Sequence, residues 1–151
     1  MIITLVTDTF DVGNNGITVS AKRFAANLID RGHTVRVVAC GEPGDARPDQ
    51  QGGPEVFWVP ELVVPIATRL AHRQNTAFGK PDRETLIAAI KDADVVHVYQ
   101  PWPLGRAAEE CCDFELHHQV AAFVTIHNWA ARSEATLWLE GLSGSLGRYP
   151  S

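Results

Sequence analysis

The chain has few cysteines, and their arrangement argues against disulfide bonds and against a metal site. Cys40 and the adjacent pair Cys111 and Cys112 do not form the even, spaced set that staples small secreted domains. We therefore expect a reducing cytoplasm, with the three thiols packed in the core. The sequence contains neither a C-x-x-C pair nor an H-E-x-x-H motif, so it predicts no metal ion and no cofactor.

Positive charge and long apolar runs are scarce as well. The 13 lysines and arginines are scattered and the formal net charge is −5, so the chain offers no cationic stripe to a nucleic acid. No apolar run approaches the roughly 20 residues that cross a bilayer. Residues 1–6 lack the basic start of a signal peptide, and no amphipathic basic helix is evident. We expect a cytoplasmic protein, whose contact with the inner face of the membrane would be peripheral.

What the sequence does contain is the pattern of a single α/β domain. With 151 residues, 45% of them hydrophobic, the chain can bury one core. Short apolar runs of strand length occur at residues 2–7, 34–40, 56–59, 94–99 and 120–126. Because most of these runs are continuously apolar rather than alternating, we expect a parallel sheet that is covered on both faces.

Helical patterns separate these strands. They cover residues 17–31, residues 82–92 and residues 104 to about 114. Gly32 is expected to end the first helix, and Asp82 is a candidate N-cap of the second. Strands that alternate with helices predict a Rossmann-like, doubly wound parallel sheet with strand order near 3-2-1-4-5. A ligand cleft is expected where this order reverses, between the first and fourth strands.

Two strand ends place polar groups at this predicted cleft. The loop after the first strand leads through Gly16 into a helix that begins near Ile17, whose unpaired N–H groups and dipole would favour a diphosphate. The glycine spacing is not G-x-G-x-x-G, and a plain Asn-Asn-Gly turn explains the loop equally well. The fourth strand contains His97, best explained as a core histidine, and ends in Tyr99 and Gln100.

The chain resembles the amino-terminal domain of family 4 glycosyltransferases of the GT-B fold. The resemblance is carried, in order, by residues 6–10 with Gly16 and Ile17, by residues 28–38, by residues 94–101, and by residues 124–127. It extends from residue 1 to about residue 129. It implies a transferase with two facing Rossmann-like domains, in which the first domain binds a glycan, lipid or small-molecule acceptor. The second domain binds a nucleotide-sugar donor, and transfer of the sugar retains the anomeric configuration.

The resemblance also implies roles for individual residues. Gly16 and Ile17 would approach the donor diphosphate, and His127, after the fifth strand, would be the catalytic residue that hydrogen-bonds the reacting sugar. The acceptor side would be lined by Asp8, Thr9, Asn15, Tyr99 and Gln100. Oriented dipoles suit this chemistry, because the departing diphosphate gains negative charge while the sugar becomes oxocarbenium-like.

The sequence departs from the family in lacking the residues of the donor-binding domain. We expect residues 1–130 to form the acceptor-side domain and residues 131–151 to form a short helix and an irregular tail. Such a truncated enzyme would be inactive unless a donor-binding domain were supplied, for instance by a partner chain. Two alternatives stay open: a stand-alone binding or regulatory module on the same scaffold, and a different nucleotide-binding α/β protein.

Overall fold

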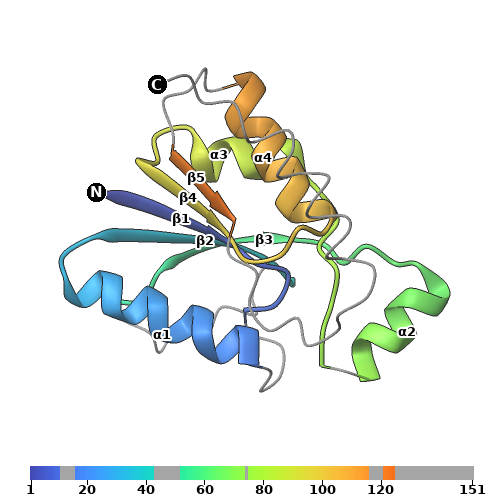
Figure 1. Ribbon diagram of the computed structural model, residues 1–151. Helices are drawn as coiled ribbons and strands as arrows, with labels where there is room; N and C mark the ends of the chain where they lie inside the picture. Colours follow the sequence, from blue (N-terminus) through green and yellow to red (C-terminus); the bar gives the residue numbers. More distant parts are fainter. Residues whose placement is uncertain (11–15, 43–51, 74, 116–120, 125–151) are drawn as a thin grey trace.

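The structure, a computed structural model, describes residues 1–10, 16–42, 52–73, 75–115 and 121–124. Its elements follow in the order β1 (Ile2–Val6), α1 (Gly16–Asp30), β2 (Thr34–Cys40), β3 (Glu55–Val59), α2 (Pro65–Arg73), α3 (Arg83–Ile90), β4 (Val95–Val98), α4 (Pro103–Glu115) and β5 (Ala121–Val124). Within these residues, the strands form one parallel sheet in the order β3-β2-β1-β4-β5 (Figure 1). The predicted α/β architecture and strand order are confirmed.

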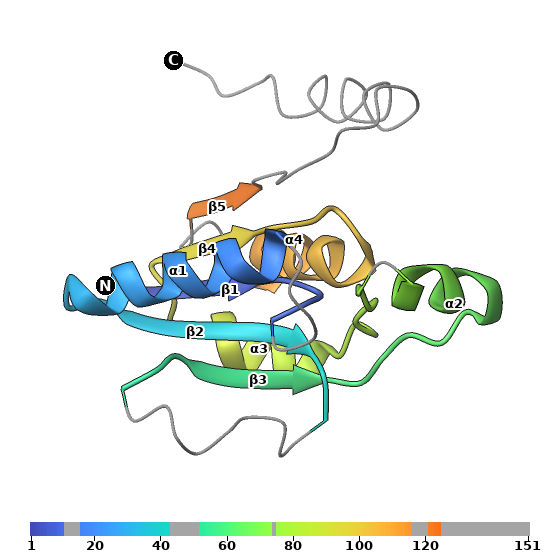
Figure 2. The same cartoon turned by 90° about the horizontal axis from the view of Figure 1, so that it is seen from below.

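Helices cover both faces of the sheet, which explains the continuously apolar strands. Helix α1 lies on one face, and α3 and α4 lie on the other (Figures 1 and 2). Leu5 of β1 packs in the cluster under α1, whereas its neighbour Val6 packs in the cluster under α3 and α4. Both side chains are buried. Since alternate residues meet different helix layers, both must be apolar.

Local sequence signals set the helix ends. The Asp82 carboxylate accepts a hydrogen bond from the Thr85 N–H at 3.2 Å, as expected of an N-cap. After α1, Gly32 adopts a φ of +82° and its N–H donates to the Ile29 carbonyl at 2.8 Å. This left-handed conformation favours glycine and ends the helix. The predicted N-cap and the predicted stop are both confirmed.

Helix α2 has no counterpart among the predicted helices. Of its residues whose burial is described, Thr68 and Ala71 are buried, while Ile66 and Leu70 are exposed. The large apolar residues of α2 recur at helical spacing but face outward, whereas the predicted helices were found from apolar faces that turn inward. In the described part of the chain, no helix is long and apolar enough to span a bilayer.

The three cysteines are buried and free, which agrees with the predicted packing role. Two of the thiols have raised pKa values, about 12 for Cys40 and about 11 for Cys112. Burial is the largest cause of both shifts. Thiols with such values are largely protonated near neutral pH and are therefore poor nucleophiles and poor metal ligands.

Ion pairs around Arg36 link strands β2 and β3 to the end of helix α3. Arg36 of β2 forms a two-point contact with the Asp92 carboxylate, which follows α3, and Arg36 Nε lies 3.5 Å from Glu55 Oε2 on β3. Chiefly through its hydrogen bond, the guanidinium holds the pKa of Asp92 below its usual value.

Candidate functional site

A buried polar cluster lies where the strand order reverses, at the adjacent carboxyl ends of β1 and β4. We call Thr7, Asp8, Thr9 and Gln100 the β1–β4 cluster; each is at most 5% exposed. Gln100 Oε1 accepts hydrogen bonds from the Asp8 backbone N–H at 3.1 Å and from Thr7 Oγ1 at 3.3 Å. The cluster therefore occupies the position at which doubly wound proteins bind ligands.

These bonds fix the orientation of the Gln100 side-chain amide. A backbone N–H can only donate, so the amide atom that faces the Asp8 N–H must be the oxygen, and Nε2 must point the other way. Nε2 is buried and has no hydrogen-bond partner among the described residues. Because a buried donor without an acceptor is costly, Nε2 is a candidate donor to a bound oxygen atom.

Asp8 joins this cluster to a distant segment of the chain. Its Oδ1 accepts a hydrogen bond from the Gly79 N–H at 2.7 Å, across 71 positions of sequence. Burial raises the pKa of the Asp8 carboxyl to about 7, and the hydrogen bond from Gly79 only partly offsets this effect. Near neutral pH the group is therefore partly protonated, unlike an ordinary aspartate.

Residues 78–80 cross the carboxyl ends of the strands, and we call this segment the strap. It pairs with the chain after β3: the Leu62 N–H donates to the Phe78 carbonyl at 2.7 Å and the Lys80 N–H donates to the Pro60 carbonyl at 2.8 Å. A Cβ atom on Gly79 would lie 2.8 Å from Leu104 Cδ2. A larger residue at position 79 would require the Leu104 side chain to shift.

The amino end of α1 is tied to the same edge of the sheet. Thr18 Oγ1 donates to the Thr9 carbonyl at 3.4 Å, and Thr7 Oγ1 lies 3.2 Å from that carbonyl. Gly16 is exposed as the first residue of α1, and Ile17 is half-buried. The first turn of α1 holds no acidic residue, so no carboxylate within the described start of the helix offsets the positive end of its dipole.

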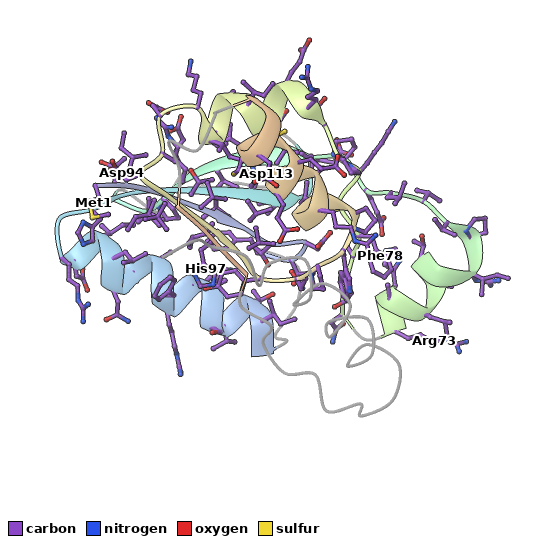
Figure 3. The ribbon with its side chains drawn as sticks, turned by 45° about the horizontal axis from the view of Figure 1, so that its top comes forward. Met1, Arg73, Phe78, Asp94, His97 and Asp113 are labelled. Atoms are coloured by element: carbon purple, nitrogen blue, oxygen red, sulfur yellow. The ribbon has the colours of Figure 1, made fainter. Side chains whose placement is uncertain are left out.

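Tyr99 lies deeper than a residue that simply lines a cleft. Its ring is 1% exposed within the core cluster under α1, and burial raises the pKa of its hydroxyl to about 12. The ring centroid lies 4.7 Å from that of His97, which in turn lies 5.3 Å from that of Phe24 on α1. Figure 3 shows His97 between the sheet and α1. His97 is half-buried and packs in an aromatic cluster, whereas the sequence predicts a core histidine.

Two predicted site residues, Asn15 and His127, lie outside the described residues. Of the other predicted site residues, the structure brings together Asp8, Thr9 and Gln100 near the start of α1. Sequence reasoning missed Gly79. The signal available for it was weak: a glycine before Lys80 and Pro81 reads as an ordinary turn. Among the described residues, no group of three or more histidines, cysteines or acidic residues could hold a metal ion.

Replacing Gln100 by leucine is expected to lower the free energy of unfolding by about 1–3 kcal/mol. The change removes Oε1 and so leaves the buried Asp8 N–H without its acceptor. Chemical denaturation measures the loss. Gln100→Glu keeps an oxygen in the same place and serves as the comparison. A leucine variant as stable as the wild type would show that this hydrogen bond is unimportant.

The fold and this cluster define a Rossmann-like α/β domain with a polar site at the reversal of strand order. A sequence profile described as Glycosyltransferase Family 4 matches residues 14–149, which is most of the chain. The chain belongs to this family, as the resemblance of its motifs implies. A comparison with curated proteins finds no match.

Proposed function

We propose that the chain is the acceptor-binding half of a nucleotide-sugar-dependent, retaining glycosyltransferase. The observation that carries the proposal is the convergence of two kinds of donor at one sheet edge. The amino end of α1 and the amide nitrogen of Gln100 both belong to the segments that meet at the carboxyl ends of β1 and β4. A reaction between two oxygen-rich substrates calls for such donors.

In this proposal the start of α1 stabilises the donor diphosphate. Gly16 permits close approach of the backbone, and the N–H groups that follow, beginning with that of Ile17, face the phosphate oxygens. Charge develops on the diphosphate as the bond to the sugar breaks, so a fixed dipole would favour the transition state more than the ground state. His127 is the proposed catalytic residue, which hydrogen-bonds the reacting sugar.

On the acceptor side, the proposed roles of the residues differ with their burial. Gln100 Nε2 is the proposed direct donor to an acceptor oxygen, because its partner is otherwise missing among the described residues. Asp8 and Tyr99 are almost fully buried, so we propose that they hold the acceptor side in shape. Thr9 carries the carbonyl that joins β1 to α1, and Asn15 completes the proposed set.

The proposed enzyme needs a donor-binding domain, and it works in the cytoplasm at or near the inner face of the membrane. Residues 1–130 would form the acceptor-side domain, and the buried, free thiols are consistent with a reducing compartment. The acceptor would be a glycan, a lipid or a small molecule, and no nucleic acid would take part.

Isothermal titration and reconstitution test this function. The chain alone should bind nucleoside diphosphate weakly, and fusion to the donor-binding domain of a family 4 enzyme should produce sugar transfer. Transfer is followed with a panel of nucleotide sugars and acceptors. Failure to bind nucleoside diphosphate or any acceptor, together with failure of every fusion to transfer sugar, would overturn the proposal.

Replacing Gly16 by valine is expected to weaken nucleoside diphosphate binding by about tenfold or more, since the side chain would hold the phosphate away from the N–H groups of α1. Titration of the fused protein gives the affinity. Gly53→Val is the matched control, because Gly53 is also exposed but precedes β3, at the opposite edge of the sheet. If the two variants bound nucleoside diphosphate with equal affinity, the start of α1 would not be part of the phosphate site.

A further inference from the structure

Two aromatic rings meet at the carboxyl end of the sheet, one from the strap and one from the loop after β4. The ring centroids of Phe78 and Trp102 are 4.6 Å apart, and the ring planes are inclined at 60°. Both residues are half-buried, whereas Tyr99, at the end of β4, is buried in the core. We call Phe78 and Trp102 the aromatic pair. Figure 3 shows Phe78 at the end of the sheet opposite Met1, where the strands finish.

The aromatic pair adjoins the β1–β4 cluster on two sides. Phe78 directly precedes Gly79, whose N–H donates to Asp8 Oδ1 at 2.7 Å. Trp102 follows Gln100 by two positions, and Gln100 Oε1 accepts a hydrogen bond from the Asp8 N–H at 3.1 Å. Asp8 is thus linked to one ring through the strap and to the other ring through Gln100. A ligand that rests on the aromatic pair therefore lies beside the polar groups of the cluster.

Hydrogen bonds hold the backbone that carries the two rings. The Phe78 carbonyl accepts from the Leu62 N–H at 2.7 Å. The Trp102 carbonyl accepts from the Arg106 N–H at 2.9 Å, at the start of α4, and Arg106 Nε donates to the Pro101 carbonyl at 3.2 Å. Because the rings are carried by ordered backbone, a ligand that stacks on them has little loop motion to remove.

The inclination of the rings limits how a ligand can use them. Two rings inclined at 60° cannot both lie flat against one ligand ring, so one of them stacks and the other supports it from the side. Trp102 has the larger face and lies closer to Gln100 along the chain. Trp102 is therefore the ring suited to stacking, and Phe78 is the ring that supports it.

A buried amide beside an aromatic face matches the two kinds of surface on a sugar ring. Gln100 Nε2 is buried and has no hydrogen-bond partner in the described part of the chain. A pyranose carries C–H groups that pack on an aromatic face and hydroxyl oxygens that accept hydrogen bonds from an amide. An acyl chain would use the aromatic face alone and would leave the buried donor unpaired, which is costly.

The charges near the aromatic pair favour a neutral ligand over an anion. Burial, the largest cause, and three nearby carboxyl groups raise the pKa of the Cys40 thiol; the carboxyl groups are those of Glu61, Asp8 and Glu42. Cys40 Sγ lies 3.7 Å from the Phe78 carbonyl oxygen, so these acidic groups lie near the strap. Lys80 of the strap is exposed to water, which screens its charge. A phosphate would therefore gain less here than at the positive end of the α1 dipole.

We propose that the aromatic pair binds a pyranose ring of a neutral glycan acceptor. The C–H face of the sugar stacks on Trp102, Phe78 holds the indole in place, and Gln100 Nε2 donates to a hydroxyl oxygen of the same ring. The inference rests on the proposed acceptor-binding function. It narrows the acceptor from a glycan, a lipid or a small molecule to a sugar.

Saccharide binding by the whole chain tests the proposal without a donor-binding domain. The probes are the methyl glycosides of glucose, mannose and galactose, together with maltose. Hexanol and glycerol phosphate stand for an acyl chain and an anionic headgroup. Saturation-transfer NMR should detect at least one saccharide with a dissociation constant of about 1–10 mM, and both other probes should bind at least about tenfold more weakly. Absence of binding by every saccharide, or tighter binding by hexanol or glycerol phosphate, would overturn the proposal.

Variants of Trp102 separate stacking from a merely structural role. Trp102→Leu should weaken saccharide binding by about tenfold or more, because an aliphatic side chain cannot stack, whereas Trp102→Phe should stay within about threefold of the wild type. Phe24→Leu is the matched control with unchanged affinity, because Phe24 is an exposed aromatic residue on α1, outside the aromatic pair. Circular dichroism verifies that each variant is folded. Equal binding by Trp102→Leu and the wild type would show that the sugar does not stack on this ring.

The fused enzyme distinguishes a failure of this inference from a failure of the proposed function. Trp102→Leu should raise the KM for a glycan acceptor by about tenfold and leave the KM for the nucleotide sugar within about twofold. Sugar transfer that Trp102→Leu leaves unchanged would overturn the inference while the proposed function stands. Saccharide binding that depends on Trp102, in a chain for which every fusion fails to transfer sugar, would support the inference and count against the proposed function.

Discussion

Replacing Gly105 by alanine is expected to lower the free energy of unfolding by more than about 3 kcal/mol. Gly105 is buried in the first turns of α4, where a Cβ atom would lie 2.1 Å from the Gln100 carbonyl oxygen and 2.7 Å from Val98 Cγ1. A backbone carbonyl cannot rotate aside as a side chain can, so α4 would have to move off the sheet. Urea denaturation, followed by circular dichroism, measures the loss.

Gly53→Ala is the matched control for this change. Gly53 is exposed before β3, and its φ is not in the left-handed region, so alanine there should alter stability by less than about 0.5 kcal/mol. If Gly105→Ala proved within about 1 kcal/mol of the wild type, the close contact between α4 and the end of β4 would be wrong.

The sheet could be predicted because its determinants are local. Each strand is an apolar run, and Asp82 and Gly32 mark helix ends by chemistry that operates within a few residues. The rule that parallel strands join through right-handed crossovers then leaves few possible orders, among which β3-β2-β1-β4-β5 is a natural one. The fold class and the expected position of the ligand site follow from these local signals.

The interior of the site could not be predicted, because it depends on contacts between distant residues. Asp8 meets Gly79 across 71 positions, and the direction of the Gln100 amide follows from a backbone N–H across 92 positions. Neither contact leaves a periodic trace in the sequence. Helix α2 was missed for a different reason: its apolar residues face outward, whereas amphipathic patterns are normally used to find inward faces.

Asp8→Asn is expected to stabilise the protein in a pH-dependent way. The carboxyl has a folded-state pKa of about 7 against an ordinary value of 3.8, so the folded state holds a proton that the unfolded state has released. Stability from this group is complete below about pH 4, falls as the pH rises toward 7, and is constant above it. Asparagine does not titrate, and its oxygen can still accept the Gly79 N–H. Relative to the wild type, the variant should therefore gain up to about 4 kcal/mol between pH 4 and pH 8.

Asp92→Asn provides a control of opposite sign. Arg36 lowers the pKa of Asp92, so this carboxylate contributes stability that is present above its unfolded pKa and is lost as the pH falls. The Asp92→Asn variant should be less stable than the wild type at pH 8, whereas Asp8→Asn should be more stable, and both differences should shrink in acid. Denaturation midpoints for the three proteins across this pH range separate the two effects. A stability difference between Asp8→Asn and the wild type that stays constant from pH 4 to pH 8 would mean that the Asp8 carboxyl is exposed to water. The strap would then not cover the carboxyl end of β1.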